Sequence, residues 1–94
     1  MKFEWDEAKS QACFQARGFD FEYSMAAFFD PNRIVMQDRR WDYGEDRFQL
    51  YGMIDDRLFF IVYTARNSLT RIISARKANQ REVTNYEIST NSDR

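Results

Sequence analysis

The sequence contains no histidine, and only one cysteine and one proline occur among its 94 residues. The lack of histidine excludes Ser–His and Cys–His catalytic pairs and the common histidine-based zinc sites. The lone Cys13 excludes an internal disulfide, and it is better explained as a small, buried helix residue than as a nucleophile without a base. Any acid–base chemistry would therefore have to come from carboxylate, tyrosine, lysine or arginine side chains.

Long apolar segments are also missing. No run of about 18 apolar residues is present, so we expect no membrane-spanning helix and no membrane partner. The first ten residues, MKFEWDEAKS, carry acidic side chains where a secretory signal peptide would need an apolar stretch. Together with the unpaired cysteine, these features predict a cytoplasmic protein.

Aromatic residues, by contrast, make up 17% of the chain. Because large rings bury much area per residue, this fraction lets a short chain build a sufficient core. A hydrophobic content of 44% and a net charge of −1 argue against a disordered chain. We expect a single domain over residues 1–94, with a frayed tail at 91–94.

The first third of the chain predicts a short strand and two helices. The strand covers residues 2–4, and the first helix is capped by Asp6 and ends near Arg17. The second helix covers residues 21–29, and Asp30–Pro31 ends it because the residue before proline disfavours the helical region. These helices would form a hairpin whose aromatic rings need a sheet to cover.

The remainder predicts a run of strands followed by a helix. The strands are expected over residues 33–38, 47–54, 58–65 and 70–76, with turns at Asp55–Asp56 and at Asn67–Ser68. Asn79 followed by Glu82 resembles a capping box, which starts a helix that ends near Ser89. The predicted fold is α+β, with a short N-terminal strand, a two-helix hairpin packed on an antiparallel sheet meander, and a C-terminal helix. The helices would cover one face of the sheet and leave the other partly exposed.

Charge is distributed unevenly along the chain. Residues 1–56 hold twelve acidic and seven basic residues, whereas residues 57–81 hold six basic residues and no acidic one. Basic side chains on a sheet can follow a phosphate backbone, with Arg47 and Tyr51 added from an open strand face and Tyr63 available to stack on a base. Two other interpretations stay open: the arginines are only solvated, or the acidic half faces a basic partner protein.

Individual residues allow chemistry without identifying it. Glu45, beside Asp46, lies in a loop before an open-faced strand, where a carboxylate can act as a general base, although such a pair more often caps a turn. Lys9 is by default a solvated helix residue, and Ser74 has no base partner in its strand. Tyr86 is more often a core ring than a catalytic phenol. Spacing alone therefore identifies no active site.

Four short blocks stand out along the chain. They are Phe3–Glu4–Trp5–Asp6 with Lys9, Phe28–Phe29–Asp30–Pro31, Glu45–Asp46–Arg47–Phe48 with Gly52, and Arg71–Ile72–Ile73–Ser74–Ala75–Arg76 with Glu82 and Tyr86. In this order and spacing, across residues 3–87, they resemble the BrnT family of bacterial toxins. Each block is weakly specific by itself, and the four together are specific.

The resemblance implies a RelE-like fold and a ribonuclease toxin that arrests growth until its antitoxin binds. The implied antitoxin resembles BrnA, a ribbon-helix-helix protein, and DNA would be bound only through the toxin–antitoxin complex. Neither a cofactor nor a metal is implied, because the nucleophile is the 2′-hydroxyl of the RNA itself. The alternative is a non-catalytic, toxin-like module that inhibits translation or represses transcription with its antitoxin. A third possibility is an unrelated interaction protein.

The expected site combines polar residues that match the family pattern with Tyr63, which only the interleaving of aromatic and basic residues suggests. The expected catalytic residues are Glu45, Arg66, Arg76 and Lys9, and the expected RNA-binding residues are Arg47, Tyr63, Ser74 and Tyr86. Glu45, or alternatively Lys9, would deprotonate the 2′-hydroxyl while the arginines stabilise the charge on the phosphate. The chain departs from the family at Ala16–Arg17–Gly18, where Lys-His-Gly is usual, and at Cys13, where Asn is usual. If the family histidine is catalytic, activity here would be impaired; alternatively, RelE-like sites built from Arg, Lys and Tyr indicate that histidine is dispensable for this chemistry.

Overall fold

The computed structural model describes residues 1–91 and is an α+β structure, as the sequence predicts. In chain order its elements are β1 (Phe3–Trp5), α1 (Glu7–Arg17), α2 (Phe21–Ser24), the 3-10 helix η1 (Met25–Phe29), β2 (Ile34–Asp38), β3 (Arg47–Ile54), β4 (Arg57–Arg66), β5 (Leu69–Lys77) and α3 (Gln80–Asn91). No helix within residues 1–91 has both the length and the apolar character that crossing a membrane requires.

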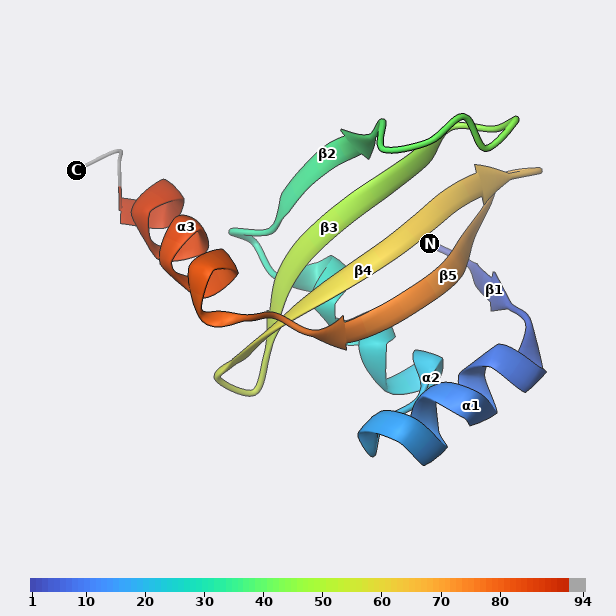
Figure 1. The fold of residues 1–94 in the computed structure, drawn as a ribbon, viewed down its shortest axis with the longest axis horizontal. Coiled ribbons are helices and arrows are strands. Elements are labelled where there is room, and N and C mark those ends of the chain that lie inside the picture. Colours follow the sequence, from blue (N-terminus) through green and yellow to red (C-terminus); the bar gives the residue numbers. More distant parts are fainter. Residues whose placement is uncertain (92–94) are drawn as a thin grey trace.

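The five strands form one mixed sheet in the order β1-β5-β4-β3-β2 (Figure 1). Strands β2 to β5 are the predicted antiparallel meander, and the predicted first strand lies one residue later than expected. β1 runs parallel to β5, with Phe3 paired to Thr70 and Trp5 to Ile72. Since β1 ends at this point, residues 73–77 of β5 pair with no strand of residues 1–91 on that side of the sheet.

Two-residue turns join the central strands, as predicted. Asp55 and Asp56 connect β3 to β4, and Asn67 and Ser68 connect β4 to β5, all four with positive φ angles between 46° and 67°. Two successive left-handed residues give a turn whose twist matches that of antiparallel strands, and Asp and Asn tolerate this conformation better than most residues. The turn chemistry therefore sets the register of both hairpins.

Helix α1 begins after its expected cap, Asp6, and ends at Arg17, as the sequence predicts. The Asp6 carboxylate accepts a hydrogen bond from the Ala8 backbone nitrogen at 2.9 Å, and Gly18 ends α1 with a φ of 84°. The second predicted helix is different, because only α2 is α-helical and residues 25–29 form the tighter η1. This segment packs directly on β3, where a Cβ at Gly52 would collide with the Ala27 carbonyl oxygen.

The main core lies between this hairpin and one face of the sheet. Its sheet residues include Leu50, Ile61 and Ile72, each 1% exposed or less. Ring contacts continue the core towards the hairpin, where Phe3 and Phe28 meet edge to face with their centroids 4.9 Å apart. The aromatic residues of the first third of the chain are thus covered by the sheet, as expected.

The C-terminal helix lies on the other face, which corrects the expectation that all helices share one face. Tyr51, Met53 and Leu58 alternate with the main-core residues along β3 and β4, so their side chains point to the opposite face. They form a second cluster with Val83 and Tyr86 of α3. Figure 1 shows α3 at one end of the sheet, away from α1 and α2. Its position depends on the strand register, which local sequence patterns do not report.

The predicted capping box at the start of α3 is confirmed. The Asn79 side chain accepts a hydrogen bond from the Glu82 backbone nitrogen at 2.9 Å, and Glu82 accepts one from the Asn79 nitrogen at 2.8 Å. The helix continues to Asn91, two residues beyond the expected end near Ser89. Of the expected frayed tail at 91–94, residue 91 is helical and residues 92–94 lie outside the described part of the chain.

Candidate functional site

A basic cleft lies at the edge of β5 that β1 leaves open, between α1 and the part of the α3-bearing face of the sheet that α3 does not cover. Its volume is about 500 Å³. It is lined by Lys9, Ala12, Cys13, Ala16, Arg17, Phe21, Arg40, Phe60, Val62, Ile73, Ser74, Ala75 and Arg76. Four of these thirteen residues are basic, and within the described chain none of the lining residues is acidic. Arg76 and Arg40 are each paired with a carboxylate that does not line the cleft, Glu82 and Asp38, so the positive charge that the described ion pairs leave uncompensated is that of Lys9 and Arg17.

One side of α1 forms the first wall of the cleft. Lys9, Cys13 and Arg17 recur every four residues, which places them along a single side of the helix. The buried Cys13 thiol lies 3.5 Å from the Ala75 carbonyl oxygen and anchors this side against β5. Burial raises the pKa of that thiol, so it stays protonated and fits the expected packing role. Lys9 and Arg17 are both exposed at the cleft edge.

The floor of the cleft comes from β4 and β5. Ser74 pairs with Val62 and Arg76 pairs with Phe60 across the two strands, so the four side chains share one face. Phe60 and Val62 are only 5% and 4% exposed. These two apolar side chains form the floor of the cleft and partly shield the neighbouring Arg76 from water.

Arg76 is held in place by four contacts, one of which is a hydrogen bond from Nη1 to the Lys77 carbonyl oxygen at 3.3 Å. Its Nη1 and Nη2 donate hydrogen bonds to the two carboxylate oxygens of Glu82 at 2.8 and 2.9 Å, and its guanidinium lies 4.2 Å from the centre of the Phe60 ring. The Tyr51 hydroxyl also donates to Glu82, at 3.2 Å. The bond from Arg76 lowers the pKa of Glu82 to about 2, and the same bond raises the pKa of Arg76. The pair is therefore charged and fixed at neutral pH.

Arg40 enters the cleft from the loop between β2 and β3. Its Nε and Nη2 bind the Asp38 carboxylate at 2.8 and 2.7 Å, and the Tyr43 hydroxyl donates to the same carboxylate at 3.1 Å. The Arg40 bonds hold the pKa of the buried Asp38 far below its usual range. Sequence reasoning missed both Arg40 and Arg17 as site residues, and no sequence pattern indicated that the loop reaches over the sheet.

Three of the expected site residues form a separate cluster. Glu45 Oε1 accepts two hydrogen bonds from Arg66, at 2.8 and 3.1 Å, and Oε2 accepts one from Arg47 at 3.4 Å. The bonds from Arg66, and then those from Arg47, lower the pKa of Glu45. The Arg47 guanidinium also lies 4.2 Å from the centre of the Tyr43 ring. Both oxygens of Glu45 are thus occupied by cations, which makes the carboxylate a weaker base.

This cluster lies far from Arg76 along the sheet. Arg76 pairs with Phe60, and Arg66 lies six residues further along β4, which corresponds to about 20 Å of strand. Each guanidinium is also held by a carboxylate on its own side. The structure therefore brings Lys9, Ser74 and Arg76 together in the cleft and separates them from the Glu45 cluster.

The two expected tyrosines lie in packed surroundings outside the cleft. Tyr63 contacts the rings of Phe28 and Phe48, with centroid distances of 5.0 and 5.5 Å, on the face that the helical hairpin covers. The Tyr86 hydroxyl is buried and donates to Asp30 Oδ2 at 2.6 Å. Burial and this bond raise the pKa of Tyr86 well above its ordinary value. Tyr86 thus connects α3 to the segment after η1.

Comparison with known proteins identifies one family. Over residues 5–82 the chain matches the family described as "Ribonuclease toxin, BrnT, of type II toxin-antitoxin system". No curated protein matches the chain. The matched region includes every residue that lines the basic cleft, as well as the Glu45 cluster. The match spans most of the 94 residues, and the chain therefore belongs to the BrnT family of ribonuclease toxins of type II toxin–antitoxin systems.

Proposed function

We propose that the basic cleft cleaves RNA by moving a phosphodiester bond onto the neighbouring 2′-hydroxyl, without a metal ion. Family membership implies an RNA target and an antitoxin partner. The observation that carries the proposal is the composition of the cleft, with four basic and no acidic lining residues among those described. An RNA backbone is the polyanion that such a surface attracts, and the internal nucleophile needs orientation and charge stabilisation more than a metal-bound water.

In this reaction the 2′-oxygen forms a bond to phosphorus while the bond from phosphorus to the 5′-oxygen breaks. The products are a 2′,3′-cyclic phosphate and a 5′-hydroxyl end. Of the two groups expected to deprotonate the 2′-hydroxyl, Glu45 and Lys9, only Lys9 lines the cleft. We therefore assign the first proton transfer to the unprotonated Lys9 amine, which takes the proton of the 2′-hydroxyl, while water protonates the leaving 5′-oxygen.

Arg76 is the residue best placed to bind the reacting phosphate. Its two terminal nitrogens bind Glu82, while its Nε–H donates no hydrogen bond within residues 1–91. A guanidinium fixed by Glu82 and by the Phe60 ring needs no reorganisation when charge develops on the phosphate. Ser74, exposed on the same face, supplies a hydroxyl for the adjacent phosphate or ribose.

The Glu45 cluster takes a different part in this proposal. At about 20 Å from Arg76 it cannot contact the same phosphate, so Arg66 and Arg47 bind the RNA backbone further along the strand. A BrnA-like, ribbon-helix-helix antitoxin, growth arrest by the free toxin and a RelE-like relationship belong to the same proposal. They are supported by the family match and by the helical hairpin packed on an antiparallel meander.

The test is RNA cleavage by the purified chain in the presence of a chelator, with the RNA ends mapped. We expect 2′,3′-cyclic phosphate ends that disappear when the antitoxin is added. Lys9→Ala should lower the cleavage rate at least about 100-fold, because general acid–base groups contribute that much. Lys9 is exposed, so this variant should fold normally, and the exposed Lys2→Ala, outside the cleft, is the matched control. Arg76→Lys keeps the charge but loses the paired geometry, and should also impair cleavage.

The competing function is a non-catalytic module that binds RNA or ribosomes and represses with its antitoxin. Arg17 favours this alternative, because it lines the cleft at the position where the family usually has histidine, and an arginine binds anions but does not exchange protons near neutral pH. If the folded chain binds its antitoxin but cuts neither free RNA nor RNA on translating ribosomes, the non-catalytic function is the correct one.

A further inference from the structure

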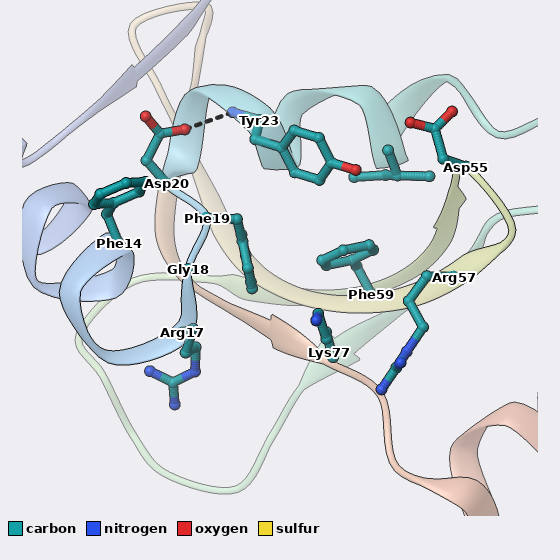
Figure 2. Close-up of a pocket in the computed structure, with 11 residues that line it drawn as sticks. Phe14, Arg17, Gly18, Phe19, Asp20, Tyr23, Asp55, Arg57, Phe59 and Lys77 are labelled. Carbon is teal, nitrogen blue, oxygen red and sulfur yellow. Dashed lines mark hydrogen bonds between the residues drawn. The ribbon is translucent and has the colours of Figure 1, made fainter.

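A second depression, of about 490 Å³, lies where the connection from α1 to α2 meets the turn between β3 and β4 (Figure 2). Its floor is aromatic. The ring centroids of Phe19 and Phe59 are 5.0 Å apart, those of Tyr23 and Phe59 5.8 Å, and those of Phe19 and Tyr23 6.1 Å. Phe14 and Tyr23 remain 50% and 43% exposed. We call this depression the aromatic groove.

The charges around the aromatic groove are sorted by sign. Figure 2 shows Arg17, Lys77 and Arg57 along one rim, and Asp20 and Asp55 along the other, with the rings between them. All five residues belong to the described chain, and within that chain none of the three cations forms an ion pair. Their charge is thus available to an anionic ligand.

The acidic rim also has free hydrogen-bond acceptors. Asp20 Oδ1 accepts from the Tyr23 backbone nitrogen at 2.9 Å and caps α2, while Oδ2 receives no hydrogen bond from residues 1–91. Asp55 occupies the turn between β3 and β4. Carboxylates in such positions accept hydrogen bonds from amino groups.

We propose that the aromatic groove is a nucleotide subsite of the RNA-binding surface, selective for a base that carries an exocyclic amino group. The base stacks on the exposed rings, its amino group donates to Asp20, and its phosphate lies on the basic rim. Aromatic stacking with neighbouring cations is the usual way in which proteins hold unpaired RNA. This inference rests on the proposed RNA-cleaving function and adds a base preference to it.

The groove is continuous with the basic cleft. Arg17 lines both, and a small depression lined by Arg17, Phe19, Arg76 and Lys77 joins them. Arg76 and Lys77 are consecutive on β5, and their side chains point to opposite faces of the sheet. Arg76 therefore lines the cleft, and Lys77 lines the groove. A strand whose reacting phosphate binds Arg76 would therefore place a flanking nucleotide in the groove.

The test compares cleavage and binding of hexanucleotides made only of cytidine or only of uridine. Non-cleavable versions, with 2′-deoxy sugars and a fluorescent label, report binding alone. Phe14→Ala and Arg57→Ala should each raise KM and Kd for the cytidine hexamer about 10-fold and leave kcat unchanged. Phe29→Ala and Arg81→Ala are matched controls, because Phe29 is 65% exposed and Arg81 is exposed, and neither lines the groove.

Asp20→Asn tests the base preference without loss of the helix cap, because asparagine caps helices as well as aspartate. Wild type should bind the cytidine hexamer more tightly than the uridine hexamer, and the variant should lose most of that difference.

A chain that cleaves RNA while Phe14→Ala, Arg57→Ala and Asp20→Asn leave KM and base preference unchanged would overturn the subsite and leave the proposed function intact. Loss of antitoxin binding alone in these variants would make the groove a protein-docking site. A wild type that neither binds nor cuts RNA would refute the proposed function itself.

Discussion

Replacing Glu82 by glutamine should make the protein less stable at neutral pH but not in acid. Glu82 joins the cleft to α3: it accepts hydrogen bonds from Arg76, from the Tyr51 hydroxyl and from the Asn79 backbone nitrogen. Its side chain is 13% exposed. Glutamine keeps the volume and one acceptor oxygen, but it removes the negative charge that faces the Arg76 guanidinium.

The magnitude follows from the pKa of Glu82, which the bond from Arg76 lowers from 4.5 to about 2. A lowered pKa means that the native state binds the proton less readily than the unfolded state, so the ionised carboxylate stabilises the fold. A difference of about 2.5 pH units corresponds to about 3 kcal/mol at most. Arg76 is 36% exposed, so solvent screening reduces the expected contribution to about 2 kcal/mol.

The stabilisation is complete above about pH 5 and is lost as the pH falls towards 2, where the native carboxylate takes up its proton. Urea unfolding of wild type and Glu82→Gln at a series of pH values measures the difference. We expect about 2 kcal/mol at pH 7, shrinking to near zero towards pH 2. Glu87→Gln, on an exposed part of the same helix, is the control and should stay within about 0.5 kcal/mol of wild type at pH 7. If the loss in free energy of unfolding caused by Glu82→Gln does not change with pH, the Glu82 carboxylate does not stabilise the fold through its charge.

Two further predictions concern the contacts that join the helices to the sheet. Gly52→Ala should destabilise the fold by about 1–3 kcal/mol, because the added Cβ collides with the Ala27 carbonyl oxygen; a thermal midpoint equal to that of wild type would contradict the close packing. Asp30→Asn should cost about 2 kcal/mol, because Asp30 Oδ2 accepts from both the Met53 nitrogen at 2.8 Å and the Tyr86 hydroxyl at 2.6 Å. Hydrogen exchange should then quicken in α3; unchanged exchange there would show that the Tyr86 bond does not hold the helix.

Local chemistry explains why most elements could be predicted from the sequence. Asp6 and the Asn79–Glu82 pair cap their helices through contacts within three residues, and the Asp55–Asp56 turn closes its hairpin through its own backbone angles. The alternation of apolar and polar residues over 47–54 likewise predicts a strand from neighbouring residues alone. The prediction was less accurate where a contact distant in sequence is involved. Residues 21–29 were expected to form one α-helix, but residues 25–29 form the tighter η1, which packs against Gly52 of β3.

The candidate site was only partly predictable. Lys9, Ser74 and Arg76 were expected on the basis of a family resemblance, and the structure places them in one cleft. Glu45 was expected beside them, but it lies near the far end of the sheet. A sequence motif reports which residue types occur together and not how far apart the strands carry them. Arg40 had no sequence signal, because it belongs to the cleft only through the path of its loop.

The sequence by itself determined the class of structure, the helix caps, the turns and the strand pattern, together with the exclusion of histidine chemistry. These properties depend on interactions between residues close together in the chain. Only the tertiary structure decided that β1 pairs with β5, that α3 covers the opposite face, and that charges from α1, β5 and a loop meet in one cleft. Each of these depends on how strands and helices pack across the sheet, where residues distant in sequence become neighbours and one-residue changes of register exchange the two faces.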